Sequence, residues 1–181
     1  GAAVAHQQGV TTMILGLTMS QFIALHVAIS LIGIGAGLIA LPAFARGRIL
    51  RRTTGIFLWA TLLTNLTGFL FPIVAFTPAL GTGIVSTLVL AVAFRAWYAR
   101  KLVGRAAPAY AVTATMALWL NLFVLVVQSF LKVPALNALA PNGTEPPFAA
   151  AQGALLIAMV GLGYLAFKAS RGRATAEDMP R

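Results

Sequence analysis

Long apolar runs without a charged residue alternate with short clusters of arginine and lysine along this chain. The first run covers residues 21–42, and the basic segment 46–52 follows it. Overall, 60% of the residues are hydrophobic and 9% are charged, whereas soluble domains carry about 25% charged residues. A soluble fold of 181 residues could not bury so much apolar surface. The chain is therefore predicted to be an all-α integral membrane helical bundle.

Five apolar runs are predicted to cross the membrane as one domain over residues 21–168. The third run is short for a hydrocarbon core of about 30 Å at about 1.5 Å per residue, unless residues of the link 78–83 join it. The predicted spans cover residues 21–42, 55–77, 84–98, 109–131 and 148–167.

The basic residues predict the orientation of the bundle. Of the 13 lysines and arginines, all except Lys132 lie in or beside the segments that follow the first, third and fifth spans. Because positive residues are retained on the cytoplasmic side, the N-terminus is predicted outside and the C-terminus inside. Residues 169–181 would then form a polar cytoplasmic tail.

Residues 1–20 allow more than one interpretation. Apart from His6 and the terminal amine the segment has no ionisable group, and it lacks the basic n-region of a signal peptide. Met13 or Met19 could be the native initiator, which would make the preceding residues an added or leader sequence. Alternatively, residues 11–19 lie on the outer membrane surface as a short apolar segment.

The residue types that are missing restrict the chemistry. Cysteine is absent, which excludes disulfides, thiolate metal sites and c-type haem attachment. A bis-histidine haem site is not expected, because His26 is the one histidine in a predicted span. Catalytic triads, paired acids and metal-ligand clusters are also missing, so we expect a non-enzymatic protein without cofactor or metal. The basic residues that give the net charge of +10 lie beside apolar runs and do not form an extended face. This distribution indicates that they set the membrane topology, and it does not favour nucleic acid as a partner.

A glycine motif in the first span predicts close helix packing. Gly33, Gly35 and Gly37 form a GxGxG string, but a phosphate-binding loop needs a strand before it and a helix after it. The pair Gly33 and Gly37 instead matches GxxxG, which allows two helix backbones to approach closely.

Seven polar residues within or beside the spans are the candidate site. In the predicted topology most of them lie in the outer half of the membrane, and His26 would lie roughly 9 Å below the outer surface. His26, Asn121, Gln128 and Gln152 are expected to turn toward the bundle interior as one shared cluster, because an unsatisfied polar group facing hydrocarbon is costly. Hydrogen bonds that only fix helix packing are one explanation; a polar pocket open to the outside, suited to a small ligand, a quinol headgroup or a proton relay, is the other. The candidate ligand-binding residues are His26, Asn65, Asn121, Gln128, Lys132, Glu145 and Gln152.

The predicted outer loop, residues 132–147, is expected to contain a short helix. Leu136 and Leu139 alternate with small residues, so this part of the loop could lie on the bundle. Thr144 is a candidate N-cap for the last span, and Pro146 suits its first turn.

Lys132 and Glu145 lie at the two ends of this loop. The helix dipole favours a carboxylate at the position of Glu145, which is a structural role. The functional alternative is that Lys132 and Glu145 pair and close the pocket as a lid.

Three segments together resemble a group of small uncharacterised polytopic inner-membrane proteins of proteobacteria. They are NLFVLVVQSFLKVPAL at 121–136, TGFLFP at 67–72 and EPPF at 145–148. The resemblance implies a helical fold in the bacterial inner (cytoplasmic) membrane, but no mechanism. Relatives often carry a histidine after the second span, where this chain has Pro-Ala-Leu at 78–80, so a relay or metal site that needs this histidine is not expected.

Three functions follow from these patterns. The first is a non-enzymatic protein that binds or transports a small molecule through an outward-facing polar pocket. The second is an accessory or assembly subunit of a larger membrane complex, and the third is a quinol-linked redox component. Beyond the lipid bilayer, the possible partners are further copies of the chain or the subunits of such a complex.

Overall fold

The computed structural model describes residues 13–71 and 78–177, and in these residues helices joined by short loops are accompanied by one short β-hairpin. Strands β1 (Met13–Ile14) and β2 (Leu17–Thr18) pair antiparallel, with Met13 opposite Thr18. The helices are α1 (Met19–Ala45), α2 (Arg51–Phe69), α3 (Pro78–Phe94), which continues as the π-helix η1 (Arg95–Ala99), α4 (Ala106–Lys132), α5 (Pro134–Asn137) and α6 (Pro146–Glu177).

Four helices of the described chain are long and apolar enough to cross a membrane. They cover Met19–Ala45, Leu80–Ala99, Ala106–Lys132 and Pro146–Gly172. Helix α2 is not among them, because two arginines in its first turn lower the mean hydropathy of its 19 residues. The prediction of a membrane helical bundle is confirmed at this level.

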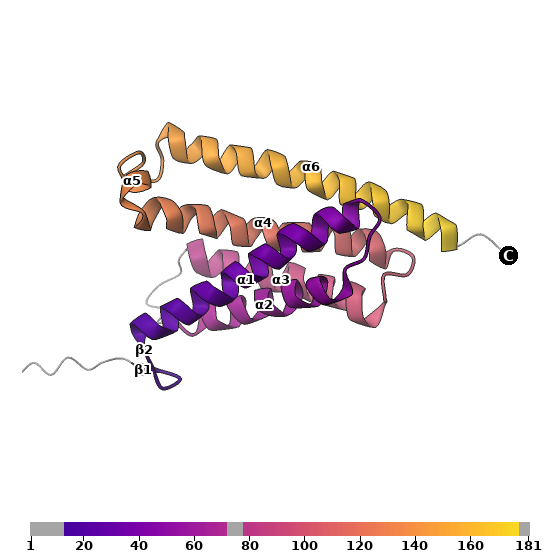
Figure 1. Cartoon of the computed structure of the whole chain (residues 1–181), viewed down its shortest axis with the longest axis horizontal. Helices are drawn as coiled ribbons and strands as arrows, with labels where there is room; N and C mark the ends of the chain where they lie inside the picture. The colour runs from indigo at the N-terminus through magenta and orange to yellow at the C-terminus, as the bar shows by residue number, and fades with distance from the viewer. Residues whose placement is uncertain (1–12, 72–77, 178–181) are drawn as a thin grey trace, which may run out of the picture.

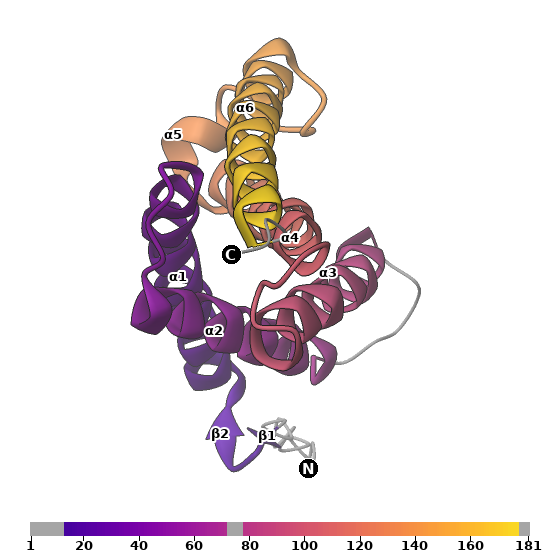
Figure 2. The same cartoon turned by 90° about the vertical axis from the view of Figure 1, so that its right-hand side faces the viewer.

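The five long helices alternate in direction along the bundle (Figure 1). Helix α1 packs along α2, α3 packs against α2 and α4, and α6 packs against α4 and α1. The view along the bundle shows α4 between α3 and α6 (Figure 2). The loops after α1 and η1 lie at one end, here called the basic end, and the β1–β2 hairpin and α5 lie at the other, here called the hairpin end.

Local sequence explains where three of these helices begin or end. Helix α1 starts at a capping box, in which Thr18 and Gln21 exchange side-chain and backbone hydrogen bonds. Of the predicted second span, residues 55–77, helix α2 covers the part up to Phe69, and residues 72–77 lie outside the described residues. The end of the helix before Pro72 fits the preference of residues before proline for a non-helical conformation. The third helix does recruit the link, since α3 begins at Pro78, where the fixed φ of proline suits a first turn.

The loop before α6 contains the predicted short helix, α5. Thr144, however, is not the N-cap of α6, because the carbonyl oxygen of Glu145 accepts the first helical hydrogen bonds, from Phe148 and Ala149. The helix begins at Pro146 and extends to Glu177, so it includes the first part of the predicted cytoplasmic tail.

The tightly packed core lies in the half of the bundle next to the basic end. In the other half, Phe22 is the one buried residue of α1 between Met19 and Ile32. Helices α1 and α6 also diverge toward the hairpin end (Figure 1). The largest buried side chains of the core are Leu41, Phe44, Phe57, Leu58, Leu90, Tyr110 and Leu118.

Two glycines of α1 allow the close packing that the GxxxG motif predicts. A Cβ atom at Gly33 would lie 3.3 Å from Ala60 Cβ, and one at Gly37 would lie 2.8 Å from both Phe57 Cδ2 and Leu118 Cδ1. A Cβ atom at Gly35 would meet nothing within 4 Å. Gly33 and Gly37 therefore face neighbouring helices, as predicted, whereas Gly35 faces outward.

Candidate functional site

Two of the predicted site residues join helices in the buried interior. Asn121 of α4 donates from Nδ2 to Thr61 Oγ1 of α2 at 3.2 Å. Asn65, one turn after Thr61 on α2, donates from Nδ2 to Ser86 Oγ of α3 at 3.1 Å. All four side chains are buried. These bonds tie α2 to α3 and α4 where an unsatisfied amide would be costly.

His26 lies between α1 and α2, about 10 Å along α1 from its first residue. Its Nδ1 atom is 2.7 Å from Thr67 Oγ1, and the same hydroxyl lies 2.7 Å from the carbonyl oxygen of Leu63. The Thr67 hydroxyl has one hydrogen and donates it to that carbonyl, so Nδ1–H of His26 is the donor to Thr67. In this tautomer Nε2 carries a lone pair.

Nε2, the second ring nitrogen of His26, is the atom that is available for a further hydrogen bond. Within the described chain, no hydrogen bond reaches Nε2. The imidazole is half-buried. It meets the ring of Phe71 edge-to-face at a centroid distance of 5.3 Å, and Phe71 in turn meets Phe22 at 5.1 Å. Gly68 of α2 lies beside the imidazole ring, since a Cβ atom at this position would lie 3.7 Å from His26 Cε1, at ordinary contact distance. His26 thus presents a fixed hydrogen-bond acceptor beside aromatic rings.

Gln152 of α6 binds the backbone of α4. Its Nε2 atom donates to the carbonyl oxygen of Phe123 at 3.2 Å. Its Oε1 atom is buried, and no donor within the described residues reaches it. The side chain is half-buried and joins α6 to α4 in the hairpin-end half of the bundle.

Gln128 does not face the bundle interior, which corrects the prediction for this residue. Asn121 and Gln128 are two turns apart on α4, yet Asn121 is buried and Gln128 is exposed. The physical reason is their depth. Seven residues correspond to about 10 Å along the axis, and at that distance from Asn121 the Gln128 side chain is no longer enclosed.

Lys132 and Glu145 do not pair, although both lie in the described part of the chain. Lys132 is exposed at the end of α4. The Glu145 carboxylate instead accepts hydrogen bonds from Asn142 N, Asn142 Nδ2 and Thr144 N, at 3.0, 2.9 and 3.0 Å. Desolvation raises the pKa of the Glu145 carboxyl, but these hydrogen bonds outweigh it and hold the pKa below its ordinary value. The lid is not formed by this pair.

The prediction that His26, Asn121, Gln128 and Gln152 share one polar cluster inside the bundle is therefore wrong. His26, Asn65, Asn121 and Gln152 each find a separate partner on a neighbouring helix. The reason is that backbone carbonyl groups and threonine or serine hydroxyls are closer to each of them than the other candidates. Their role in ligand binding stays a prediction. No group of three metal-ligating side chains comes together within the described ranges.

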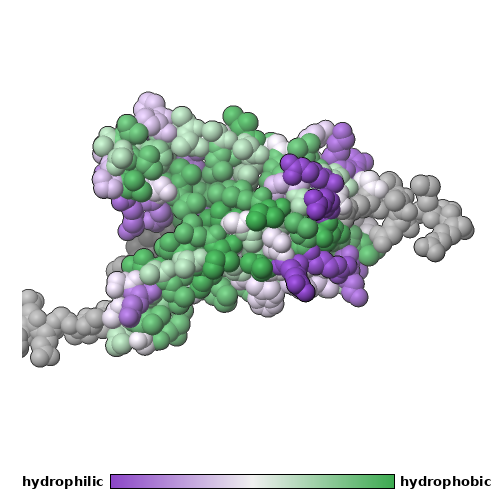
Figure 3. Space-filling model, viewed as in Figure 1, coloured by the Kyte–Doolittle hydropathy of each residue, from purple (hydrophilic) through white to green (hydrophobic). Residues whose placement is uncertain are grey.

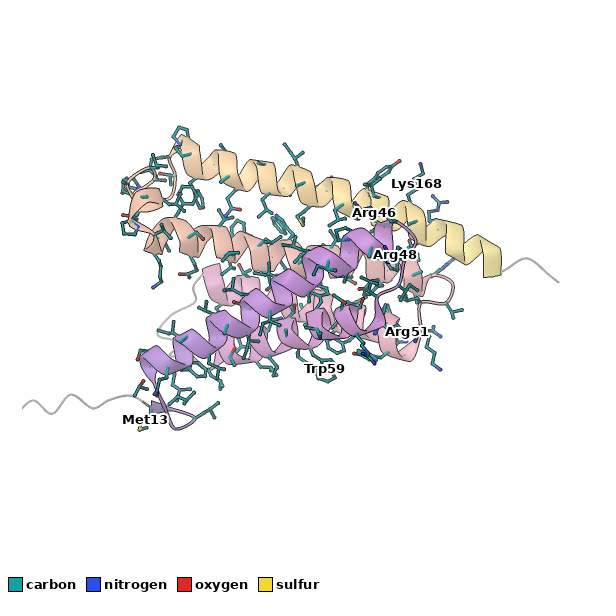
Figure 4. All side chains as sticks on the ribbon, viewed as in Figure 1. Met13, Arg46, Arg48, Arg51, Trp59 and Lys168 are labelled. Atoms are coloured by element: carbon teal, nitrogen blue, oxygen red, sulfur yellow. The ribbon has the colours of Figure 1, made fainter. Side chains whose placement is uncertain are left out.

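Positive charge gathers at the basic end, where Arg46, Arg48, Arg51 and Lys168 lie together (Figure 4). The same end is strongly hydrophilic on the molecular surface, next to a broad apolar belt (Figure 3). A cavity of about 340 Å³ lies there, lined by Ile49, Arg51, Trp97, Tyr98, Lys101 and Leu102. Sequence analysis missed it, although adjacent Trp and Tyr before a basic cluster are a signal of an interfacial site.

No family model, curated protein or solved structure matches this chain. The site must therefore be interpreted from its own geometry. Sequence analysis did not identify Thr67 and Ser86 as partners of His26 and Asn65. The available signal was that threonine and serine occur within the spans that also carry polar residues. This signal does not specify which helices meet, so it does not identify the pairs.

Proposed function

We propose that this chain is a non-enzymatic protein of the bacterial inner membrane that binds a small amphipathic molecule at an outward-facing site centred on His26. The proposal includes five spans with the N-terminus outside and the C-terminus in the cytoplasm. The single observation that carries it is the orientation of the His26 imidazole by Thr67, which leaves Nε2 without a partner among residues 13–71 and 78–177.

The proposed topology is supported by helix lengths and charge. The 19 residues of α2 correspond to about 28 Å, close to the thickness of a hydrocarbon core of about 30 Å. Alternating helix directions bring the basic loops together at one end, as expected when positive residues stay in the cytoplasm (Figure 4). The hairpin end, and with it the His26 side of the bundle, would then face outward.

The surroundings of His26 indicate the class of ligand. A lone pair on Nε2 accepts a hydrogen bond from a hydroxyl group, and the half-buried ring of Phe71, which packs on the fully buried Phe22, suits an apolar or aromatic body. Most residues of α1 in this half are exposed, so a ligand could approach His26 from the bilayer. A hydroxyl-bearing apolar molecule, such as a quinol headgroup with its tail in lipid, fits this combination.

Extraction of co-purified small molecules tests this proposal. The full chain is purified in mild detergent, extracted with organic solvent and analysed by mass spectrometry. We expect a hydroxyl-bearing apolar molecule in the unaltered protein and about fivefold less in His26→Leu, because one hydrogen bond of about 1 kcal/mol is lost.

Two further variants complete the experiment. Thr67→Val should reduce the amount in the same way, since the imidazole loses its orientation, and Gln128→Leu on the exposed side of α4 should leave it unchanged. Circular dichroism checks that each variant is folded. Equal amounts in all four proteins, or no such molecule in any, would refute the proposal.

A second candidate function, an accessory subunit of a membrane complex, is favoured by the exposure of α6. Ala150, Ala154, Ala158 and Gly161 are exposed at helical spacing, and a Cβ atom at Gly161 would meet nothing within 4 Å. Small residues at this spacing let a second helix approach closely in the bilayer. Cross-linking from α6 to a defined subunit, lost in Ala154→Leu, would favour this function over the first.

A further inference from the structure

The cavity at the basic end is formed by two segments that are distant in sequence, residues 49–51 and 97–102. Ile49 precedes α2, and Arg51 is its first residue. Trp97 and Tyr98 belong to η1, and Lys101 follows it. The cavity has a volume of about 340 Å³, which is within the usual range of small-molecule sites.

Both cations of this cavity are available to a ligand. Arg51 and Lys101 are exposed, and neither side chain forms an ion pair or hydrogen bond with any residue in the described ranges. The chain has three acidic residues against 13 lysines and arginines, and Glu145 lies at the hairpin end. Two unpaired cations on one cavity favour an anionic ligand.

The aromatic wall of the cavity is rigid. The Tyr98 ring stacks on Phe94 with a centroid distance of 5.5 Å and an interplanar angle of 25°. Its hydroxyl oxygen accepts a hydrogen bond from Trp59 Nε1 at 3.0 Å, which leaves the hydroxyl hydrogen free to donate. The Trp97 ring lies against Tyr110 at 5.3 Å. The wall therefore combines an oriented donor with apolar surface.

The backbone places Lys101 beside this wall. The five-residue π-helix ends the third span, and the N–H of Arg100 donates to the carbonyl oxygen of Arg95. Lys101 and Leu102 then adopt positive φ angles of 48° and 62°, and both residues line the cavity. Glycine would adopt this conformation at lower cost.

We propose that this cavity binds a phosphate group. Arg51 and Lys101 supply the charge, the Tyr98 hydroxyl supplies a directed hydrogen bond, and Trp97 covers the adjoining apolar part. The phosphate could be carried by an anionic lipid headgroup at the membrane surface or by a soluble phosphate compound, because both offer the same charge and acceptor oxygens. This site is separate from His26, which belongs to the opposite half of the bundle.

Native mass spectrometry of the detergent-solubilised full chain tests the site, with phosphatidylglycerol and phosphatidylcholine of equal chain length as probes. We expect one tightly bound phosphatidylglycerol and weaker phosphatidylcholine. The double variant Arg51→Gln/Lys101→Gln should bind phosphatidylglycerol about thirtyfold more weakly, since each cation near a phosphate contributes about 1 kcal/mol.

The matched control is Arg46→Gln/Lys168→Gln, which removes the same charge from the same end of the bundle, outside the cavity (Figure 4). It should change the affinity less than about threefold. Equal weakening in both double variants, or equal affinity for the two lipids, would overturn the proposal. Displacement of the lipid by millimolar inorganic phosphate assigns the site to soluble phosphate compounds, and resistance to displacement assigns it to lipid.

If the double variant does not fold, the single variant Lys101→Gly tests the same site. Glycine suits a φ of 48°, so this variant should be at least as stable as the unaltered chain and still lose about fivefold in affinity for phosphatidylglycerol. Unchanged affinity in a folded Lys101→Gly protein would count against a phosphate site. This result is independent of His26, so it separates the two sites.

Discussion

Asn121 of α4 and Thr61 of α2 are joined by a 3.2 Å hydrogen bond within the buried interior of the bundle. One turn further along α2, Asn65 bonds to Ser86 of α3. Helix α2 therefore carries two polar links one turn apart, one to α4 and one to α3. In a bilayer these links specify which helices pair, because helix association there has no hydrophobic driving force of its own.

The Asn121–Thr61 bond should be measurable as a coupling energy. Asn121→Leu should lower the free energy of unfolding by about 1–3 kcal/mol, since Thr61 is left in an apolar interior. Combining it with Thr61→Val in a double-mutant cycle should give a coupling of about 0.6 kcal/mol, and no more than about 1.7 kcal/mol. Unfolding in mixed micelles measures all four proteins. Gln128→Leu, on the exposed side of α4, should change the free energy by less than about 0.5 kcal/mol.

Gly37 and Gly35 are a matched pair for testing the packing of α1. Gly37→Ala places a Cβ atom 2.8 Å from Phe57 and Leu118 side-chain atoms and should lower the free energy of unfolding by about 1–3 kcal/mol. Gly35→Ala meets no atom and should be neutral or stabilising by up to about 1 kcal/mol, because alanine favours the helix. Thermal unfolding in detergent ranks the two. Equal effects would mean that α1 is rotated from the position described.

The absence of cysteine makes the topology directly testable. Single cysteines at Arg48 and Asn142 lie at opposite ends of the bundle. In intact cells, a membrane-impermeant maleimide should label Arg48→Cys only after the membrane is opened, and Asn142→Cys at once. Labelling of both positions from outside would contradict an odd number of spans between them.

Glu145 should titrate below an ordinary glutamate. Its lowered pKa means that the turn stabilised by this carboxylate is fully formed above about 4.5, the ordinary value, and is lost as the pH falls through the lower folded value. The amide protons of Asn142 and Thr144 report this by NMR, since both donate to the carboxylate. Glu145→Gln should remove the transition. A midpoint at or above the ordinary value would contradict the hydrogen-bonded arrangement.

The polar residues show how far sequence reasoning extends within the bundle. That Asn65 and Asn121 turn inward was predictable, because an amide facing hydrocarbon is too costly. Their partners were not, since Thr61 and Ser86 could equally have bonded to their own helix backbones. Gln128 was placed wrongly for a related reason, because periodicity gives the side of a helix but not how far its neighbours extend.

Sequence alone determined the class of fold, the approximate positions of four helices long and apolar enough to cross a membrane, and the segregation of basic residues to one end. These depend on the transfer of apolar segments into lipid and on hydrogen bonding within each helix, which are local properties. The tertiary structure decided that His26 meets Thr67 and that Arg51 and Lys101 share a cavity with Tyr98. Such contacts join residues far apart in the chain, and they depend on the rotation and crossing of whole helices, which side-chain packing settles only when all helices are present.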